Sequence, residues 1–308
     1  MQGVPKLLLS SVVRGSQQGD SHGGLYLVDV EKREFEQVLD WNTGGIDWEG
    51  RGADRGLRGI VVVGKEIWIA ASDELFVFDP WFRQLASYRN PYLKHCHEMS
   101  FHHGKLYLTS TGFDALLRFD LASRQFDLGI AMTSDNGAIN AHGFDPRRAA
   151  NGPAPNNIFH INSVHADDTG VFVAGRKIPA LVQLTQSAIG VVAGLPRGTH
   201  NARPFRGGVL FNDTDSDSVV WNGPNGRVTI RVPLYDPILL QHRDADASGI
   251  ARQGFARGLC VLSETLVAAG SSPTTVSIHD LAAGQCVASL NLTLDVRNAA
   301  HGLAAWPF

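Results

Sequence analysis

Six segments of the sequence each carry a strongly polar residue where an apolar run begins. Three of these residues are histidines, two are arginines and one is an asparagine: Arg58, His97, Asn162, His200, Arg257 and His301. Burying several such groups together costs free energy unless a ligand, a metal ion or a counter-charge compensates. If the six segments are equivalent parts of one fold, their polar residues indicate a functional site rather than packing positions.

The histidines of this set have the chemistry of metal ligands. Three imidazoles on separate rigid elements can bind a divalent metal ion and leave coordination positions open for water or substrate. We therefore predict a divalent metal ion (Zn, Fe, Mn or Cu) held by His97, His200 and His301. His160 lies two residues before Asn162, on the same side of an extended strand, and is a fourth candidate ligand.

The two arginines bring permanent positive charge and planar groups of donors, which suit a carboxylate, sulfate or phosphate. We predict that Arg58 and Arg257 orient a small anionic substrate. With Asn162 and Glu98 they are the predicted catalytic residues. Glu98 follows His97 directly and should face the opposite side of its strand. There we expect it to orient a neighbouring histidine.

The elements that must position these residues follow from an internal repeat. Each copy has a strand, a Gly-containing turn, a second strand ending in small residues, a third ending in Asp, and a fourth after a polar turn. The clearest copies run from Leu57 to Arg89 and from His97 to Gly129, and they align Trp68 with Tyr107. Looser copies begin at Asn162, His200 and Arg257. A repeated four-stranded sheet is typical of the blades of a β-propeller.

The two ends of the chain complete the repeat. Residues 300–308, AHGLAAWPF, supply only an opening strand, whereas the N-terminal KLLLSSVV, GGLYLVDV and FEQVLDW supply only later strands. We predict an all-β fold in which residues 1–308 form a single six-bladed β-propeller, closed by the C-terminal inner strand pairing with the N-terminal strands. Such pairing covers strand edges that would otherwise be exposed. The six polar residues then begin the innermost strands, at one mouth of the central channel.

Two connections are longer than the others, and both precede an innermost strand. They run from Ala131 to Asn157 and from Pro233 to Gln253, so we expect both to overhang the same mouth of the channel. Long connections in compact domains are often functional. The sequence HHG at 102–104 is instead typical of a hairpin turn, where we expect the imidazoles of His102 and His103 to be solvated.

Composition narrows the class of partner. The formal net charge is -3 and there is no Lys/Arg-rich run, which argues against nucleic acid or a membrane surface as the main partner. The three cysteines have no metal-type pair spacing, which predicts a reduced, cytoplasmic protein without a disulfide framework. The apolar segment from Leu7 to Val13 is short and interrupted by serines, so we expect a strand rather than a signal peptide.

Stretches beside the polar residues resemble the blade motifs of a poorly characterised family of bacterial six-bladed propellers. Its blades read roughly H-D-V-A-W, H-L-N-G-L, P-H-S-P-R-W and G-F-P-R-G-L-A-F. The matching stretches here are HEMSF at His97, HINSV at His160, THNARPF at Thr199 and GFARGLCV at Gly254. Glu98 stands where that family has Asp, and Asn201-Ala202 replaces Ser-Pro. The resemblance implies a propeller fold and no particular activity.

More distantly, the sequence is similar to the gluconolactonase and senescence-marker propellers. That group binds one divalent cation in its channel through Glu, Asn and Asp. Of these residue types the six-residue set offers only Asn162, so the resemblance does not imply lactone hydrolysis.

Three functions are compatible with these features. The leading hypothesis is a metal-dependent enzyme acting on a small anionic substrate, as a hydrolase, lyase, isomerase or oxygenase. The second is a metal-free lyase or epimerase with a histidine as base and the arginines stabilising an enolate-like carboxylate. The third is a propeller without catalytic activity that binds a ligand or serves as a scaffold.

Overall fold

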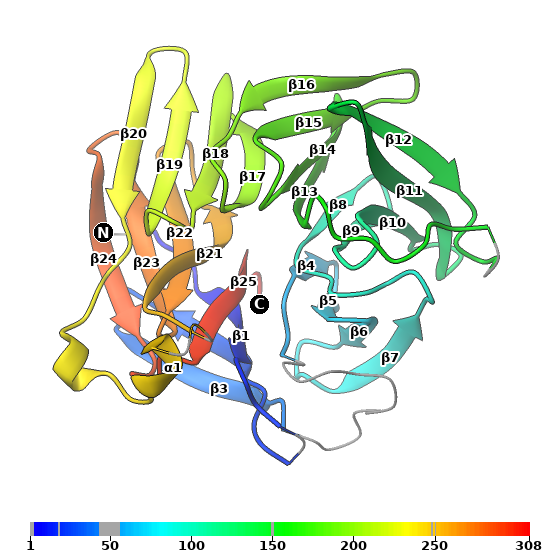
Figure 1. Cartoon of the computed structure of the whole chain (residues 1–308). Helices are drawn as coiled ribbons and strands as arrows, with labels where there is room; N and C mark the ends of the chain where they lie inside the picture. The colour runs from blue at the N-terminus through cyan, green and yellow to red at the C-terminus, as the bar shows by residue number, and fades with distance from the viewer. Residues whose placement is uncertain (1–2, 18, 43–55, 149–150, 248, 250) are drawn as a thin grey trace.

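Six antiparallel sheets are arranged around a central axis (Figure 1). This computed structural model describes residues 3–17, 19–42, 56–148, 151–247, 249 and 251–308. The arrangement confirms the prediction of an all-β six-bladed propeller, and each copy of the repeat is one blade. We number the blades 1 to 6 along the chain from the first complete copy.

The strands of each blade follow one another from the axis outward. Blades 1 to 3 contain β4 (Ile60–Val63), β5 (Glu66–Ala71), β6 (Glu74–Phe78), β7 (Gln84–Arg89); β8 (Met99–His102), β9 (Lys105–Ser110), β10 (Ala115–Asp120), β11 (Gln125–Asp135), β12 (Ala138–Phe144); and β13 (Ile161–Asp167), β14 (Gly170–Gly175), β15 (Ala180–Leu184), β16 (Ile189–Gly194). Blades 4 to 6 contain β17 (Thr199–Phe205), β18 (Gly208–Asp213), β19 (Ser218–Gly223), β20 (Gly226–Arg231); β21 (Gly254–Val261), β22 (Leu266–Ser272), β23 (Thr275–Asp280), β24 (Gln285–Asn291); and β25 (Asn298–Ala305), β1 (Leu7–Val13), β2 (Gly24–Asp29), β3 (Glu34–Asp40).

Blade 6 joins the two ends of the chain, as predicted. Its strand order is β25-β1-β2-β3, and the β25–β1 register runs from Leu7 opposite Ala305 to Val13 opposite Asn298. The same strand also lies close to blade 1. A Cβ atom added at Gly302 would come within 2.1 Å of the carbonyl oxygen of Arg58, which leaves no room for a side chain there. Glycine at this position therefore allows the inner strands of blades 6 and 1 to lie side by side.

The blades are held to one another mainly by apolar side chains. The described residues form a separate hydrophobic cluster between each pair of neighbouring blades. Between blades 1 and 2, for example, Trp68 and Phe119 are fully buried with ring centroids 5.5 Å apart. Each blade thus buries both of its faces, which explains why the inner and middle strands are almost continuously apolar.

The Asp that ends the third strand of several blades has a local structural role. Oδ1 of Asp79, Asp120 and Asp280 accepts a hydrogen bond from the backbone N–H two residues further on, in the turn that leads to the outer strand. Asx turns of this kind fix the chain reversal. The repeated Asp is therefore explained by turn geometry, not by chemistry.

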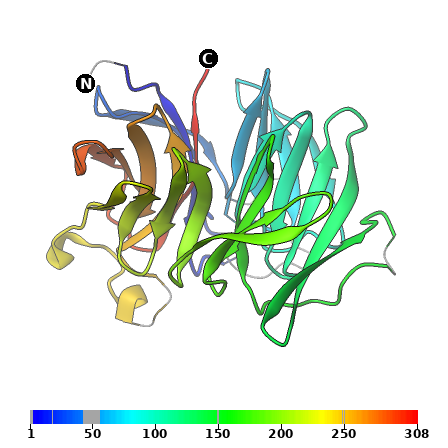
Figure 2. The same cartoon turned by 90° about the horizontal axis from the view of Figure 1, so that it is seen from above.

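The two long connections, 131–157 and 233–253, lie on the same face of the ring. Only part of the first connection reaches the channel. Residues 138–144 form β12, a fifth strand at the outer edge of blade 2, so this part does not overhang the mouth as expected. The second connection contains the short helices η1 (Pro237–Leu239) and α1 (Asp244–Ala247). Figure 2 shows α1 on one face of the ring and both chain termini on the other. No described helix is long and apolar enough to cross a membrane.

Stability should depend on pH through a histidine inside blade 5. His279 of β23 is fully buried, and burial lowers its pKa from 6.5 to about 4. Between these two pH values the His279 side chain of the unfolded chain binds more protons than that of the folded chain. The free energy of unfolding therefore has its full contribution from His279 above about pH 6.5 and loses it as the pH is lowered. We expect His279→Gln to reduce the loss of unfolding free energy between pH 7 and pH 5 by about 2 kcal/mol.

Urea denaturation of both proteins at each pH measures this difference. His142 of β12 is exposed, and His142→Gln serves as the control, which should keep the full decline. An unchanged slope in His279→Gln would show that this imidazole does not titrate differently in the two states.

Candidate functional site

The structure brings four of the six predicted polar residues into one layer across the channel. The Nη1 atom of Arg58 lies 3.1 Å from Nε2 of His97, and Nη1 of Arg257 lies 3.3 Å from Nε2 of His301. The rings of His97 and His301 are 5.4 Å apart between centroids. We call these four side chains the Arg–His layer. They come from blades 1, 2, 5 and 6, so four different inner strands contribute to this layer.

His97 and His200 are oriented by the same device in two different blades. Nδ1 of His97 donates to the carbonyl oxygen of His95 at 2.9 Å, and Nδ1 of His200 donates to that of Gly198 at 2.9 Å. A carbonyl oxygen only accepts, so in both rings Nδ1 carries the hydrogen and Nε2 presents a lone pair.

A threonine at the end of the second strand completes this device. Thr111 Oγ1 lies 3.2 Å from Nδ1 of His97, and Thr214 Oγ1 lies 2.8 Å from Nδ1 of His200. Each hydroxyl donates to a carbonyl of the next blade, that of Ile161 or Ala256, so it can only accept from the imidazole. The tautomer is thus fixed by contacts that also join neighbouring blades.

A second set of residues, which we call the second tier, lies two positions before His97, Asn162, His200 and Arg257 in the sequence. In four blades the residue there has a positive φ: His95 (54°), His160 (54°), Gly198 (84°) and Phe255 (53°). Three of these residues are not glycine, and left-handed backbone at non-glycine residues is uncommon outside turns and functional sites. The conformation turns the carbonyls of His95 and Gly198 toward the imidazoles and leaves the side chains of His95, His160 and Phe255 around the mouth.

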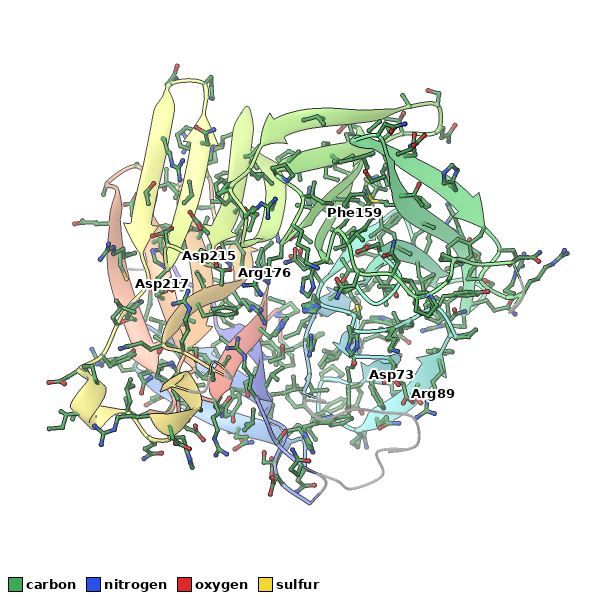
Figure 3. The ribbon with its side chains drawn as sticks, viewed as in Figure 1. Asp73, Arg89, Phe159, Arg176, Asp215 and Asp217 are labelled. Atoms are coloured by element: carbon green, nitrogen blue, oxygen red, sulfur yellow. The ribbon has the colours of Figure 1, made fainter. Side chains whose placement is uncertain are left out.

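A cavity of about 650 Å³ opens at this mouth. Its described lining contains the arginines Arg14, Arg58, Arg176, Arg252 and Arg257, the histidines His95, His97 and His160, and one carboxylate, that of Asp215. Figure 3 shows Arg176 and Asp215 near the centre of the ring. Positive charge therefore dominates the mouth cavity although the whole chain carries a formal charge of -3.

The ring of Phe255 contacts the guanidinium groups of three of these arginines. The guanidinium carbons of Arg14 and Arg257 lie 4.3 Å from its ring centroid, and that of Arg252 lies 5.1 Å away. The face of an aromatic ring attracts guanidinium groups and packs against them. Asp217 fixes this arrangement, since Oδ1 accepts from the backbone N–H of Phe255 and from Nη1 of Arg252, both at 2.7 Å.

The buried imidazoles are neutral in this environment. Burial, followed by the nearby arginines, holds the pKa of His97 and His301 well below 6.5, and burial and Arg257 do the same for His200. His160 is less buried, and desolvation with the charge of Arg257 lowers its pKa to about 4. These rings are therefore available as bases or hydrogen-bond acceptors at neutral pH.

The predicted metal ligands do not form a compact set. In the part of the chain that the structure describes, one group of three has its metal-binding atoms within 4.8 Å of one another: His102, His103 and Asp168. This exposed group could hold a metal ion. His97, His200, His301 and His160 form no such group, and Nε2 of two of them faces a guanidinium.

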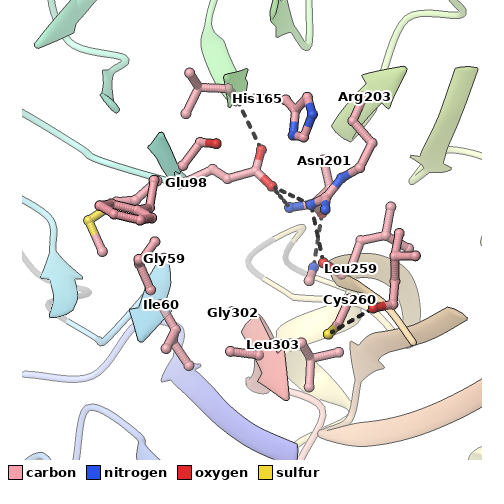
Figure 4. A pocket seen from close by; sticks show the side chains of 18 of the residues that line it. Gly59, Ile60, Glu98, His165, Asn201, Arg203, Leu259, Cys260, Gly302 and Leu303 are labelled. Atoms are coloured by element: carbon pink, nitrogen blue, oxygen red, sulfur yellow. Dashed lines mark hydrogen bonds and ion pairs between the residues drawn. The ribbon is translucent and has the colours of Figure 1, made fainter. Parts of the chain in front are cut away.

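Glu98 has partners other than the expected histidine. It lies in a second cavity of about 390 Å³ on the other side of the Arg–His layer, which it shares with Asn201 and Arg203 (Figure 4). Its Oε1 accepts from Nδ2 of Asn201 at 2.9 Å, and its Oε2 accepts from the backbone N–H of Val164 at 3.1 Å. Glu98 thus joins blades 2, 3 and 4, and its predicted role in orienting a histidine is wrong.

Asn162 and His200 are buried within the ring of blades and do not reach the mouth cavity. Nδ2 of Asn162 donates to the carbonyl oxygen of Thr199 across the seam between blades 3 and 4. His200 is only 2% exposed, and among the described residues its Nε2 has no hydrogen-bond partner. Neither residue lines the mouth cavity.

Comparison with known proteins gives the fold alone. No protein-family model matches the sequence, and no curated protein matches it. A chain in the crystal structure of a nidogen/laminin complex has a similar fold, with a TM-score of 0.59, 9% identity and 97% of both chains covered. The shared feature is the six-bladed propeller.

Two bacterial propellers are more distant. Apo AztD from Citrobacter koseri has a TM-score of 0.48 at 10% identity, with 95% of this chain and 84% of AztD covered. A catalytically inactive virginiamycin B lyase from Staphylococcus aureus, solved with quinupristin, has a TM-score of 0.47 at 10% identity, with 89% and 80% covered. At these levels of similarity, no activity carries over to this chain.

Proposed function

We propose that the mouth cavity binds a small polyanion and that the protein acts on it as a metal-free lyase or epimerase. The observation that carries the proposal is the lining: the described residues around this cavity include five guanidinium groups and three imidazoles but one carboxylate. Guanidinium groups recognise carboxylates and phosphates through paired hydrogen bonds. Clustering them against their mutual repulsion is favourable when an anion is bound.

His160 is the base in this proposal. Its Nδ1 lies 3.0 Å from Oδ1 of Asn157, an acceptor, so Nδ1 carries the hydrogen and Nε2 offers its lone pair. His160 lines the mouth cavity, and its ring lies 5.5 Å from that of His97. Geometry, tautomer and accessibility therefore favour His160 over the more deeply buried His200.

The reaction would start at the carbon next to the substrate carboxylate. Nε2 of His160 takes the proton, and the electron pair of the C–H bond moves into the carboxylate to give an enediolate, stabilised by Arg58 and Arg257. In epimerisation the returning electron pair takes a proton from a water molecule on the opposite face, and the hydroxide that remains removes the proton from Nε2 of His160. In elimination the electron pair expels a group from the neighbouring carbon, and the leaving group takes the proton from Nε2 of His160.

The metal-dependent reaction remains the alternative for the same cavity. It requires a divalent ion (Zn, Fe, Mn or Cu) on the imidazoles, but the lone pairs of His97 and His301 face guanidinium groups, and their positive charge opposes a second cation. Metal analysis of protein purified without an affinity tag separates the two proposals. A full equivalent of a transition metal that is lost in His97→Ala would favour the metal-dependent enzyme.

Titration with a panel of dicarboxylates, sugar acids and phosphorylated sugar acids tests the proposal. We expect at least one anion to bind, and to bind more weakly as the salt concentration rises, because screening weakens the attraction. In D₂O the bound substrate should gain deuterium at the carbon next to its carboxylate. His160→Gln should abolish this exchange and leave the affinity within about three-fold, since the arginines hold the ligand.

Two outcomes would count against the proposal. Preference for neutral or cationic ligands would rule out the anion site. Binding without isotope exchange in the wild-type protein would leave a ligand-binding propeller without this catalytic step.

A further inference from the structure

We propose that His102, His103 and Asp168 form a binding site for a divalent metal ion of the zinc class that ties blade 2 to blade 3. The three residues lie at two hairpins: His102 ends β8 and His103 follows it in the β8–β9 turn of blade 2, and Asp168 lies in the β13–β14 turn of blade 3. Nε2 of His103 lies 2.8 Å and Nε2 of His102 lies 3.3 Å from the same atom, Oδ1 of Asp168. Three potential ligand atoms from two blades thus converge on one point.

The backbone of the turn creates this convergence. Successive residues of an extended strand point to opposite faces, so neighbouring histidines would normally diverge. His103 instead has a φ of 45°, and its ring lies 4.0 Å from that of His102 between centroids. The two imidazoles therefore approach the carboxylate together. The turn was expected to leave both rings solvated, but His102 is only 23% exposed in its side chain.

The ligand types select the class of metal. Two imidazole nitrogens and one carboxylate oxygen suit Zn²⁺, Co²⁺, Ni²⁺ or Cu²⁺ better than Ca²⁺ or Mg²⁺, which prefer oxygen ligands alone. In the structure each Nε2 faces an acceptor oxygen and so carries the hydrogen. Metal binding moves the hydrogen of each ring to Nδ1, which frees the Nε2 lone pairs, and the ion takes the place of the shared hydrogen bonds.

This site is separate from the mouth cavity. His102 is the last residue of β8 and lies five residues after His97 of the Arg–His layer, so roughly 16 Å of extended chain separates the two residues. The turn therefore lies toward the face opposite the mouth. A metal here would act on the stability of the seam between blades 2 and 3, and its binding does not depend on the proposed reaction.

Calorimetric titration of tag-free, chelator-treated protein with Zn²⁺ tests the inference, and the visible spectrum of the Co²⁺ complex reports the ligand set. We expect one saturable equivalent. The double variant His103→Ala/Asp168→Asn should weaken the binding at least about ten-fold, because even partners outside the ligand shell change metal affinity by that factor. Both residues are largely exposed, with 78% and 83% of their side chains accessible, so the variant should fold normally.

Thermal unfolding supplies a second readout. Zn²⁺ at about a hundred times its Kd should raise the Tm of the wild-type protein by roughly 5 °C. The rise should disappear in the double variant and remain in His142→Ala, which removes an exposed histidine of β12. Absence of a saturable equivalent in the wild-type protein, or equal affinity and an equal Tm rise in the double variant, would overturn the inference.

Discussion

Deletion of residues 299–308 is expected to abolish the native fold, so that the truncated protein aggregates or shows no cooperative thermal transition. The deletion removes nearly all of β25, which pairs with β1 over seven register positions. It also removes Ala300 and Leu303, which belong to the cluster between blades 5 and 6. The exposed edge of β1 would then be free to pair with other chains.

A shorter deletion supplies the control for this experiment. Removal of Pro307 and Phe308 leaves β25 intact and retains Trp306, whose ring stacks on Phe82 of blade 1 at a centroid distance of 5.4 Å. This protein should keep a cooperative transition close to that of the full chain. If deletion of 299–308 also left the Tm unchanged, pairing within blade 6 would not be needed to close the ring.

Replacing Arg58 and Arg257 together with glutamine is expected to weaken binding of the anionic ligand by roughly a hundred-fold or more, since each charged hydrogen bond contributes about 1.5–3 kcal/mol. Both side chains line the mouth cavity and belong to the Arg–His layer. The dependence of affinity on salt should also become shallower, because two of the five arginines in the described lining of the cavity are gone.

Two further variants make this measurement specific. Arg231→Gln removes an exposed arginine from β20 and should leave the affinity unchanged. Arg58→Lys/Arg257→Lys keeps the charge and removes the planar pair of donors, so its affinity should lie between those of the wild type and the glutamine variant. Equal affinity in all four proteins would place the anion elsewhere.

The sequence was sufficient for the architecture because the blade repeat is a pattern of alternating side chains and turns. Once two copies were aligned, Arg58, His97, Arg257 and His301 had to lie at equivalent places near the axis, and the structure brings these four together. Closure through blade 6 followed from the strands missing at each end. Register in such sheets is strongly specified, since a slip of one residue exchanges the two faces.

The second tier could not be predicted in the same way. The repeat alignment treats each blade as extended strand, but His95, His160 and Phe255 adopt left-handed backbone, which is uncommon for residues other than glycine. Gly198 is the one member whose type hints at this conformation. The remaining arginines of the mouth cavity come from segments outside the inner strands, whose positions depend on contacts with other blades, such as that between Asp217 and Arg252.

The role of Glu98 also lay beyond the repeat. Alternation predicted that it faces away from His97, but not which blade it would contact. Its partners Val164 and Asn201 belong to two other blades, 66 and 103 positions further along the chain. Contacts of this kind depend on the curvature of the closed ring, which no single blade specifies.

The shared blade also sets an order of events during folding. The backbone N–H of Gly302 donates to Oγ of Ser10 across 292 positions of the chain. Blades 1 to 5 contain all their strands once residue 291 has been synthesised, whereas β1, which is made before all of them, must wait for β25. Such non-local pairing forms slowly, and the unpaired edge is open to association in the meantime. The imidazole of His301 would therefore be among the last groups to reach its place, so nascent chains should gain ligand affinity only after most of their secondary structure has formed.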